Sequence, residues 1–222
     1  MELFDVMRTT FAARDFTSDP VPDEVLYRIL DNARFAPSGG NRQGWKVLVI
    51  REDATREALF RLMMPTFRRY YAQSRAGEAP LNTIHPTALT DEEIAATEPP
   101  EDFIRRIADA PVVLLVLVDL SVVASMDAAL PRVGVISGAS IYPFVHNILL
   151  AARHEGLGGT PTTFVAAQED ELKALLGIPD HLAVASLIPM GRPVKQLTRL
   201  KRRPVEEFAM LERWGGPPLT GG

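Results

Sequence analysis

The sequence contains no cysteine, which excludes disulfides, thiolate nucleophiles, cysteine-zinc sites and cysteine-ligated clusters. No G-x-G-x-x-G motif follows an expected strand, and no G-x-x-x-x-G-K-[ST] motif occurs, so a resident dinucleotide domain or a P-loop is not expected. Any redox chemistry must therefore use a bound cofactor.

Long apolar runs are also missing. The longest is residues 112–118, far short of the roughly 20 residues that cross a bilayer, and the N-terminus has Glu2 and Asp5 instead of a basic leader. These features predict a cytoplasmic protein without a membrane partner. With 222 residues that are 46% hydrophobic, we expect a single domain over residues 1–222.

Positive charge is scarce and consists mostly of arginine. The formal net charge is −4, and only four of the 24 cationic side chains are lysine. An acidic balance argues against a general nucleic-acid partner, while arginine favours bidentate contacts with anions. The histidines show no metal-ligand spacing supported by carboxylates, so no metal site is expected.

Hydrophobic periodicity predicts helices over 3–9, 23–34, 54–64, 133–153 and 169–176, and strands over 45–50, 112–118 and 183–188. Pro65 is expected to end one helix, and Pro143 to kink another. The strands do not alternate regularly with helices, which favours an α+β layer over a doubly wound sheet.

Two segments look different from the rest. Residues 65–110 mix aromatics, arginines and prolines, which predicts an insertion outside the core. Residues 193–222 lack strong periodicity, and an extended tail of this kind is expected to embrace a neighbouring chain.

The most informative segment is Ala36-Pro-Ser-Gly-Gly-Asn-Arg-Gln-Gly-Trp45. Its small residues let the backbone approach a ligand, while Ser38, Asn41 and Gln43 offer hydrogen-bonding side chains at near-alternating positions. Such a loop suits the edge of a heterocycle or a polyol. With basic residues near both chain ends, it fits a cofactor that has a phosphate at one end and a ring at the other, and FMN has this layout.

The whole chain resembles the nitroreductase family of FMN-dependent oxidoreductases from about residue 3 to residue 208. Three blocks carry the resemblance: a basic opening over residues 8–16, followed by Pro20-Val-Pro22; the A-P-S-x-x-N-x-Q-x-W segment over 36–45; and G-L-G-G-x-P over 156–161 with the distal Lys201-x-Arg203. The resemblance implies a mainly antiparallel sheet flanked by helices, in a homodimer that binds FMN at its interface.

The resemblance also implies roles for individual residues. Arg8, Arg14, Lys201 and Arg203 would hold the phosphate. Thr162 or Thr163 would present a backbone N–H to flavin N5, and Arg105 or Arg106 would lie near N1 and O2. The full set of implied cofactor residues is Arg8, Thr10, Arg14, Pro37, Ser38, Gly39, Asn41, Gln43, Arg105, Pro161, Thr162, Thr163, Lys201 and Arg203.

The implied reaction moves hydride from NADH or NADPH to flavin N5 and on to a flat small-molecule acceptor such as a nitroaromatic or quinone. No side chain is expected to act as nucleophile or general base. Phe67, Arg68, Tyr70 and Tyr71 are candidates for a lid over the flavin, although their aromatic rings are as well suited to pack inward on a surface helix.

The chain departs from the family pattern at four positions. Phe11 and Ala12 replace a basic residue and a Ser or Thr, Gly44 replaces proline, and Thr163 stands where many members have Glu. Alternatives are therefore a flavin-storage protein, a relative that consumes flavin with oxygen, an FMN-free interaction protein, or a reductive dehalogenase. The last is less favoured because 65–110 offers Tyr70, Tyr71 and Glu78 but no lysine for an amino-acid clamp.

Overall fold

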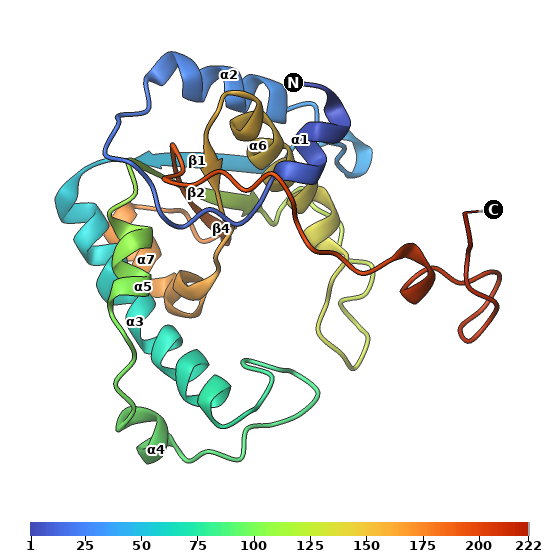
Figure 1. The fold of residues 1–222 in the computed structure, drawn as a ribbon. Coiled ribbons are helices and arrows are strands. Elements are labelled where there is room, and N and C mark those ends of the chain that lie inside the picture. Colours follow the sequence, from blue (N-terminus) through green and yellow to red (C-terminus); the bar gives the residue numbers. More distant parts are fainter. Residues whose placement is uncertain (222) are drawn as a thin grey trace.

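The computed structural model describes residues 1–221. Its centre is a four-stranded sheet in the order β1-β2-β4-β3, in which every neighbouring pair is antiparallel. The strands are β1 (Trp45–Ile50), β2 (Val112–Asp119), β3 (Gly158–Gly159) and β4 (Leu182–Gly191). Figure 1 shows helices on both sides of this sheet. The predicted α+β class with an antiparallel sheet is confirmed.

Strand β2 is the centre of the core, because its side chains contribute to two separate hydrophobic clusters. Val112, Leu114, Val116 and Val118 belong to one cluster, and Val113, Leu115 and Leu117 belong to the other. Side chains alternate between the two faces of a strand, so a continuous apolar run is required where helices cover both faces.

The two faces are covered by different helices (Figure 1). Helices α2 (Asp23–Ala33) and α6 (Tyr142–His154) cover one face, with α1 (Leu3–Thr9) beside α6. Helices α3 (Asp53–Arg75), α5 (Asp102–Ala108) and α7 (Glu169–Leu176) cover the other.

Helix α3 corrects the prediction that Pro65 ends a helix, because it continues through Pro65 to Arg75. A proline inside a helix removes one N–H donor, here the one that would bond to the Arg61 carbonyl. Pro65 is exposed, so this loss falls on the solvent side. On the inner side, Leu59, Met63 and Phe67 are buried, and their burial holds the helix together across the proline.

The predicted helix over 133–153 is also wrong in its first part. Helix α6 begins only at Tyr142, with Pro143 in its first turn. There a missing N–H costs nothing and the fixed φ suits a helix start, so Pro143 starts the helix instead of kinking it. The preceding residues form a loop and the 3-10 turn η2 (Ser137–Ser140).

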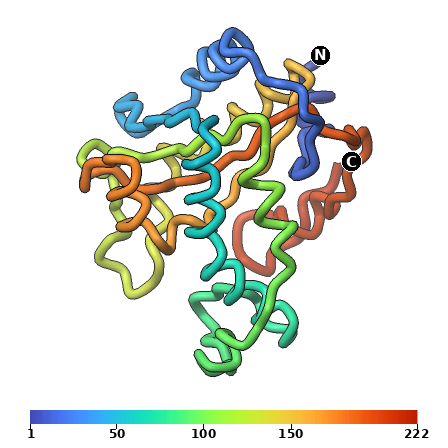
Figure 2. The backbone as a smooth tube through the Cα atoms, turned by 90° about the vertical axis from the view of Figure 1, so that its left-hand side faces the viewer, coloured from blue at the N-terminus to red at the C-terminus, as the bar shows by residue number. Residues whose placement is uncertain are grey.

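Residues 76–101 form a lobe that projects from the body and carries helix α4 (Asp91–Ala95), as Figures 1 and 2 show. The predicted insertion at 65–110 is therefore too wide. Its ends belong to α3 and α5, whose residues Phe67, Ile104 and Ile107 lie in the core.

The C-terminal segment first pairs with the N-terminal segment and then runs away from the body (Figure 1). The Val194 N–H donates to the Asp15 carbonyl at 3.1 Å, and Gln196 Nε2 donates to the Thr9 carbonyl at 3.0 Å. Further on come the 3-10 turn η4 (Val205–Glu207) and a bridge between Met210 and Pro218.

Within residues 1–221, no helix combines the length and the apolar character needed to span a membrane.

Candidate active site

The polar loop between α2 and β1 is organised by its own side chains. Ser38 Oγ accepts from the Gln43 backbone N–H at 3.0 Å, and Gln43 Nε2 donates to Asn41 Oδ1 at 3.1 Å. The Gly39 N–H donates to Ser140 Oγ at 3.1 Å, which ties the loop to η2. The three side chains selected from the sequence therefore act as one connected group.

The backbone of this loop is unusual. Gly40, Asn41 and Gln43 have φ values of 60°, 53° and 51°, in the left-handed region that residues other than glycine rarely occupy. Gly40 and Asn41 lie in the 3-10 turn η1 (Gly39–Asn41). Such conformations cluster at ligand-binding sites, where the surrounding structure maintains the strain.

Gly44 departs from the family's proline for a reason visible in the packing. A Cβ atom at this position would lie 2.8 Å from Val122 Cγ2, and the Gly44 carbonyl accepts from the Asp119 N–H at 2.7 Å. The segment after β2 therefore lies against the loop and leaves no room for a side chain. This contact limits how far the loop can move.

A second group of predicted residues lies around the turn after β3. The Thr162 N–H donates to the Leu187 carbonyl, and the Leu187 N–H donates to the Thr162 carbonyl, both at 2.8 Å. Within residues 1–221, no acceptor is found for the Thr163 N–H. Of the two threonines, Thr163 is thus the one whose backbone donor is available to a ligand.

A cavity of about 280 Å³ opens at this turn. Arg14 is the charged residue in its wall, and Phe103 and Tyr70 supply aromatic surface. The Arg14 guanidinium lies 5.8 Å from the centre of the Phe103 ring. The lining residues are Arg14, Tyr70, Pro80, Leu81, Phe103, Ile107, Thr160, Pro161, Thr162, Thr163 and Phe164.

Neither Arg106 nor Arg105, the two alternatives expected beside the flavin ring, lines this cavity. Arg105 contacts helix α3. Its Nη1 donates to Glu57 Oε2 at 2.6 Å, and its guanidinium lies 3.6 Å from the centre of the Phe60 ring. The hydrogen bond from Arg105 lowers the pKa of the Glu57 carboxyl below its ordinary value. Arg105 thus serves to join α5 to α3.

The aromatic residues of the predicted lid have different positions. Phe67 is buried and stacks on Phe103, with ring centroids 5.1 Å apart. Of the two alternatives for Phe67, a lid or an inward-packed ring, its burial favours the second. Tyr70 is 39% exposed, lines the cavity and meets Phe164 edge to face at 5.5 Å. Arg68 and Tyr71 are partly buried and do not line the cavity.

The predicted phosphate ligands are surface residues. Arg8 is exposed, with its guanidinium 6.0 Å from the centre of the Phe4 ring. Arg203 lies 3.9 Å from Glu207, and Lys201 is exposed. The Thr10 hydroxyl donates to the Val6 carbonyl at 2.7 Å at the end of α1. Gln196, five residues before Lys201, is the part of the tail that pairs with Thr9 in the N-terminal segment.

The polar loop and the Thr163 turn lie at different edges of the sheet. The loop leads into β1, the strand at one edge, whereas the turn follows β3 at the other. Three inter-strand spacings of about 4.8 Å separate these edges by roughly 14 Å. The polar loop and the Thr163 turn of one chain are therefore separated by the width of the sheet.

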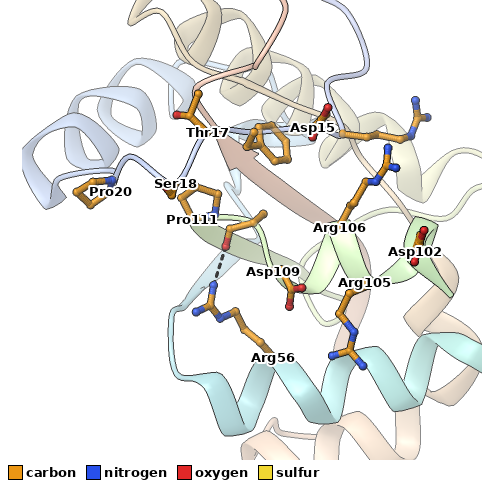
Figure 3. Close-up of a pocket in the computed structure, with 13 residues that line it drawn as sticks. Asp15, Thr17, Ser18, Pro20, Arg56, Asp102, Arg105, Arg106, Asp109 and Pro111 are labelled. Carbon is orange, nitrogen blue, oxygen red and sulfur yellow. Dashed lines mark hydrogen bonds between the residues drawn. The ribbon is translucent and has the colours of Figure 1, made fainter.

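A larger cavity of about 650 Å³ adjoins the Arg14 side of α5 (Figure 3). It lies between residues 14–20 and helices α3 and α5, and four arginines contribute to its wall: Arg14, Arg56, Arg105 and Arg106. Arg14 is common to both cavities.

Sequence reasoning missed Phe103 because residues 65–110 were interpreted as an insertion. The available signal was the spacing of Phe103, Ile104, Ile107 and Ala108, which is that of an amphipathic helix. This helix positions one wall of the smaller cavity.

Comparison with known proteins agrees with this architecture of a helix-flanked antiparallel sheet. The chain belongs to the nitroreductase family, whose profile matches residues 7–192. Members of this family are FMN-dependent oxidoreductases.

Among relatives, the chain is 28% identical to an NADH dehydrogenase of Thermus thermophilus, over 89% of each chain. Among solved structures it resembles a BluB-like flavoprotein of Clostridium difficile 630, with a TM-score of 0.70, 20% identity and coverage of 96% of this chain and all of the other. It also resembles an iodotyrosine deiodinase bound to FMN and 3-iodo-L-tyrosine, with a TM-score of 0.65, 23% identity and coverage of 92% and 96%.

Proposed function

We propose that this chain is an FMN-dependent oxidoreductase that passes hydride from NADH or NADPH through flavin N5 to a flat acceptor such as a nitroaromatic or quinone. The observation that carries the proposal is the composition of the smaller cavity. It combines the cationic Arg14, the available Thr163 N–H and the aromatic Tyr70 and Phe103. A planar, reducible heterocycle needs these three kinds of contact.

The residues of this cavity fit the ring of FMN. When bound, FMN supplies the N5 position that accepts and releases hydride. The Thr163 N–H would donate a hydrogen bond at N5. Arg14, which the family resemblance assigned to the phosphate, would here take the place expected for Arg105 or Arg106 and stabilise negative charge that develops on the pyrimidine side.

The phosphate half of FMN would be held by Arg8, Lys201 and Arg203, with Thr10 alongside. The pairing of residues 192–196 with the N-terminal segment supports this grouping, because Gln196 contacts Thr9, next to Arg8, and lies five residues before Lys201. Guanidinium groups bind phosphate through charge-assisted bonds, which are roughly twice as strong as neutral ones. Because Phe11 and Ala12 offer neither charge nor hydroxyl, the distal pair would carry more of this binding.

We also propose that the complete site forms in a homodimer. The loop with Pro37, Ser38, Gly39, Asn41 and Gln43 lies about 14 Å across the sheet from the Thr163 turn, so a second copy would supply it to each flavin. Exposed apolar side chains support an association. Trp214 and Phe208 on the tail are 92% and 67% exposed, and Met126 after β2 is 85% exposed.

The projecting lobe is proposed to act as the lid of this single domain. Pro80 and Leu81 from the lobe line the cavity beside Tyr70, so movement of the lobe would change access to the flavin. Glu78 is held within the lobe by the Thr87 hydroxyl at 2.6 Å and the Ala88 N–H at 2.8 Å. A carboxylate engaged in this way is poorly placed to clamp an amino acid, which argues against a dehalogenase.

The proposal is tested by the visible spectrum of the purified protein, before and after addition of FMN, followed by anaerobic NADH and NADPH. Flavin absorption that bleaches with a nicotinamide is the expected result, and turnover should then depend on an added quinone or nitroaromatic. A flavin that binds but is reduced by neither nucleotide would point to a storage protein. Failure to take up FMN would leave an interaction protein with this fold.

A further inference from the structure

The larger cavity has a wall of mixed charge, of which the proposed flavin site uses only Arg14 (Figure 3). Two of its arginines are already engaged. Arg56 donates to the Ala110 carbonyl at 2.8 Å and pairs with Asp53 at 2.6 Å, and Arg105 pairs with Glu57. These two residues therefore act mainly as fixed parts of the wall.

The other two arginines are not neutralised. Within residues 1–221, neither Arg14 nor Arg106 has a carboxylate within 4.0 Å. Figure 3 shows Arg106 directed toward the N-terminal segment at Asp15, away from Arg105, which points toward α3. Arg14 and Arg106 thus offer charged donors to an anion, and arginine suits phosphate oxygens in particular.

Carboxylates in the same wall are also available to accept hydrogen bonds from a ligand. Asp15, Asp102 and Asp109 line the cavity, and none of them forms an ion pair in the described part of the chain. Carboxylates accept hydrogen bonds from ribose hydroxyls in nucleotide sites. A ligand that carries both phosphates and sugar hydroxyls would therefore use both kinds of group.

The two cavities adjoin each other. Arg14 lines both, and α5 contributes Phe103 and Ile107 to the smaller cavity but Asp102 and Arg106 to the larger. A long ligand with a flat group at the flavin side could thus extend past Arg14 along α5.

We propose that the larger cavity binds the ADP-ribose half of the reducing dinucleotide, with Arg106 contacting its diphosphate and the aspartates its ribose hydroxyls. This assignment rests on the proposed function, because it assumes that the nicotinamide is placed against a flavin in the smaller cavity. The site has about 650 Å³, which is in the range of pockets that enclose ligands of this size.

The test uses Arg106→Gln, with Arg34→Gln as the matched control. Arg34 is an exposed arginine at the end of α2, on the opposite face of the sheet, where it pairs with Asp31. Two measurements are made on flavin-loaded protein: binding of ADP-ribose by titration calorimetry, and KM for NADH compared with reduced nicotinamide mononucleotide, which lacks the ADP half.

We expect Arg106→Gln to weaken ADP-ribose binding and raise KM for NADH, each about tenfold, as loss of one charge-assisted bond at a solvent-accessible site would. KM for the reduced mononucleotide and the flavin content should not change, and Arg34→Gln should behave as wild type. Unchanged ADP-ribose affinity would overturn the proposal, and so would loss of flavin, which would assign Arg106 to FMN. If wild type is reduced by neither nucleotide, the proposed function fails instead, and the calorimetry still reports separately on the cavity.

Discussion

The indole ring of Trp45 lies flat on the phenyl ring of Phe144, with ring centroids 4.7 Å apart and planes 2° from parallel. This contact joins the first residue of β1 to the first turn of α6. Because Trp45 directly follows the polar loop, the stack fixes one end of that loop. The Gly39 contact with Ser140 fixes the other end to the segment just before α6.

Replacement of Trp45 by alanine should therefore lower the free energy of unfolding by about 3 kcal/mol, through lost packing and lost stacking. Trp45→Phe keeps a stacked ring and should cost less than half as much. Urea denaturation of both variants measures the difference. An alanine variant within 0.5 kcal/mol of wild type would show that the stack does not hold the loop.

Asn41→Gly separates the backbone role of this residue from its side-chain role. Glycine accepts a φ of 53° without strain, so the melting temperature should stay the same or rise slightly. FMN affinity should fall severalfold, because the amide that would contact the cofactor is gone. Fluorescence titration with FMN provides the measurement, and equal affinity in both proteins would remove Asn41 from the site.

Arg8→Ala combined with Arg203→Ala should weaken FMN retention by removing two charge-assisted phosphate contacts, each worth about 1.5 to 3 kcal/mol in favourable geometry. Both side chains are exposed, so their removal should leave the unfolding curve of the flavin-free protein almost unchanged. The flavin-to-protein ratio after dialysis is the readout. Full occupancy in the double variant would contradict the phosphate assignment.

The contacts of Asp127 should make its contribution to the free energy of unfolding depend on pH. It accepts from the Val135 N–H at 2.8 Å and from Arg132 Nη1 at 2.7 Å, and the Val135 bond, together with the Arg132 and Ile136 bonds, lowers the pKa of its carboxyl below the usual range. A folded-state pKa below the unfolded value gives stability above about pH 4, the unfolded pKa of an aspartate, and this stability is lost as pH falls through the folded value.

Asp127→Asn should therefore be less stable than wild type at pH 7, and the difference should shrink as the pH falls below about 4, the unfolded pKa of an aspartate. Denaturation at a series of pH values measures this difference. The same change at Asp180, an exposed residue in a turn, serves as the control. If the difference in stability between Asp127→Asn and wild type persists unchanged to pH 3, the substitution acts through altered hydrogen-bond geometry and not through the lost charge.

The fold was largely predictable because its strongest signals are local. The apolar run of β2 required cover on both faces, and the amphipathic stripe of α2 required a core beneath it. The effects of Pro65 and Pro143 were predicted wrongly because the effect of a proline depends on its position in the helix. Pro65 lies on the solvent side of α3, and Pro143 lies at the start of α6. Hydrophobic periodicity alone shows neither position.

The candidate site was predictable only in part. Side chains close in sequence, such as Ser38, Asn41 and Gln43, were identified together because one loop carries them. The role of Arg105 depended on a partner 48 residues earlier, Glu57, and the wall formed by Phe103 depended on how α5 packs. The positions of these side chains are determined by tertiary contacts, which local sequence patterns do not show.

The chain has two tryptophans, and they occupy opposite environments. Trp45 is stacked within the body, whereas Trp214 on the tail is 92% exposed. The protein therefore carries two intrinsic optical reporters, and Trp214→Phe assigns their emission. If a second copy covers the tail, the emission maximum of the wild type should shift to shorter wavelength as the protein concentration rises, and the Trp214→Phe variant should not show this shift. In that variant the remaining emission comes from Trp45, so its quenching would report binding at the polar loop.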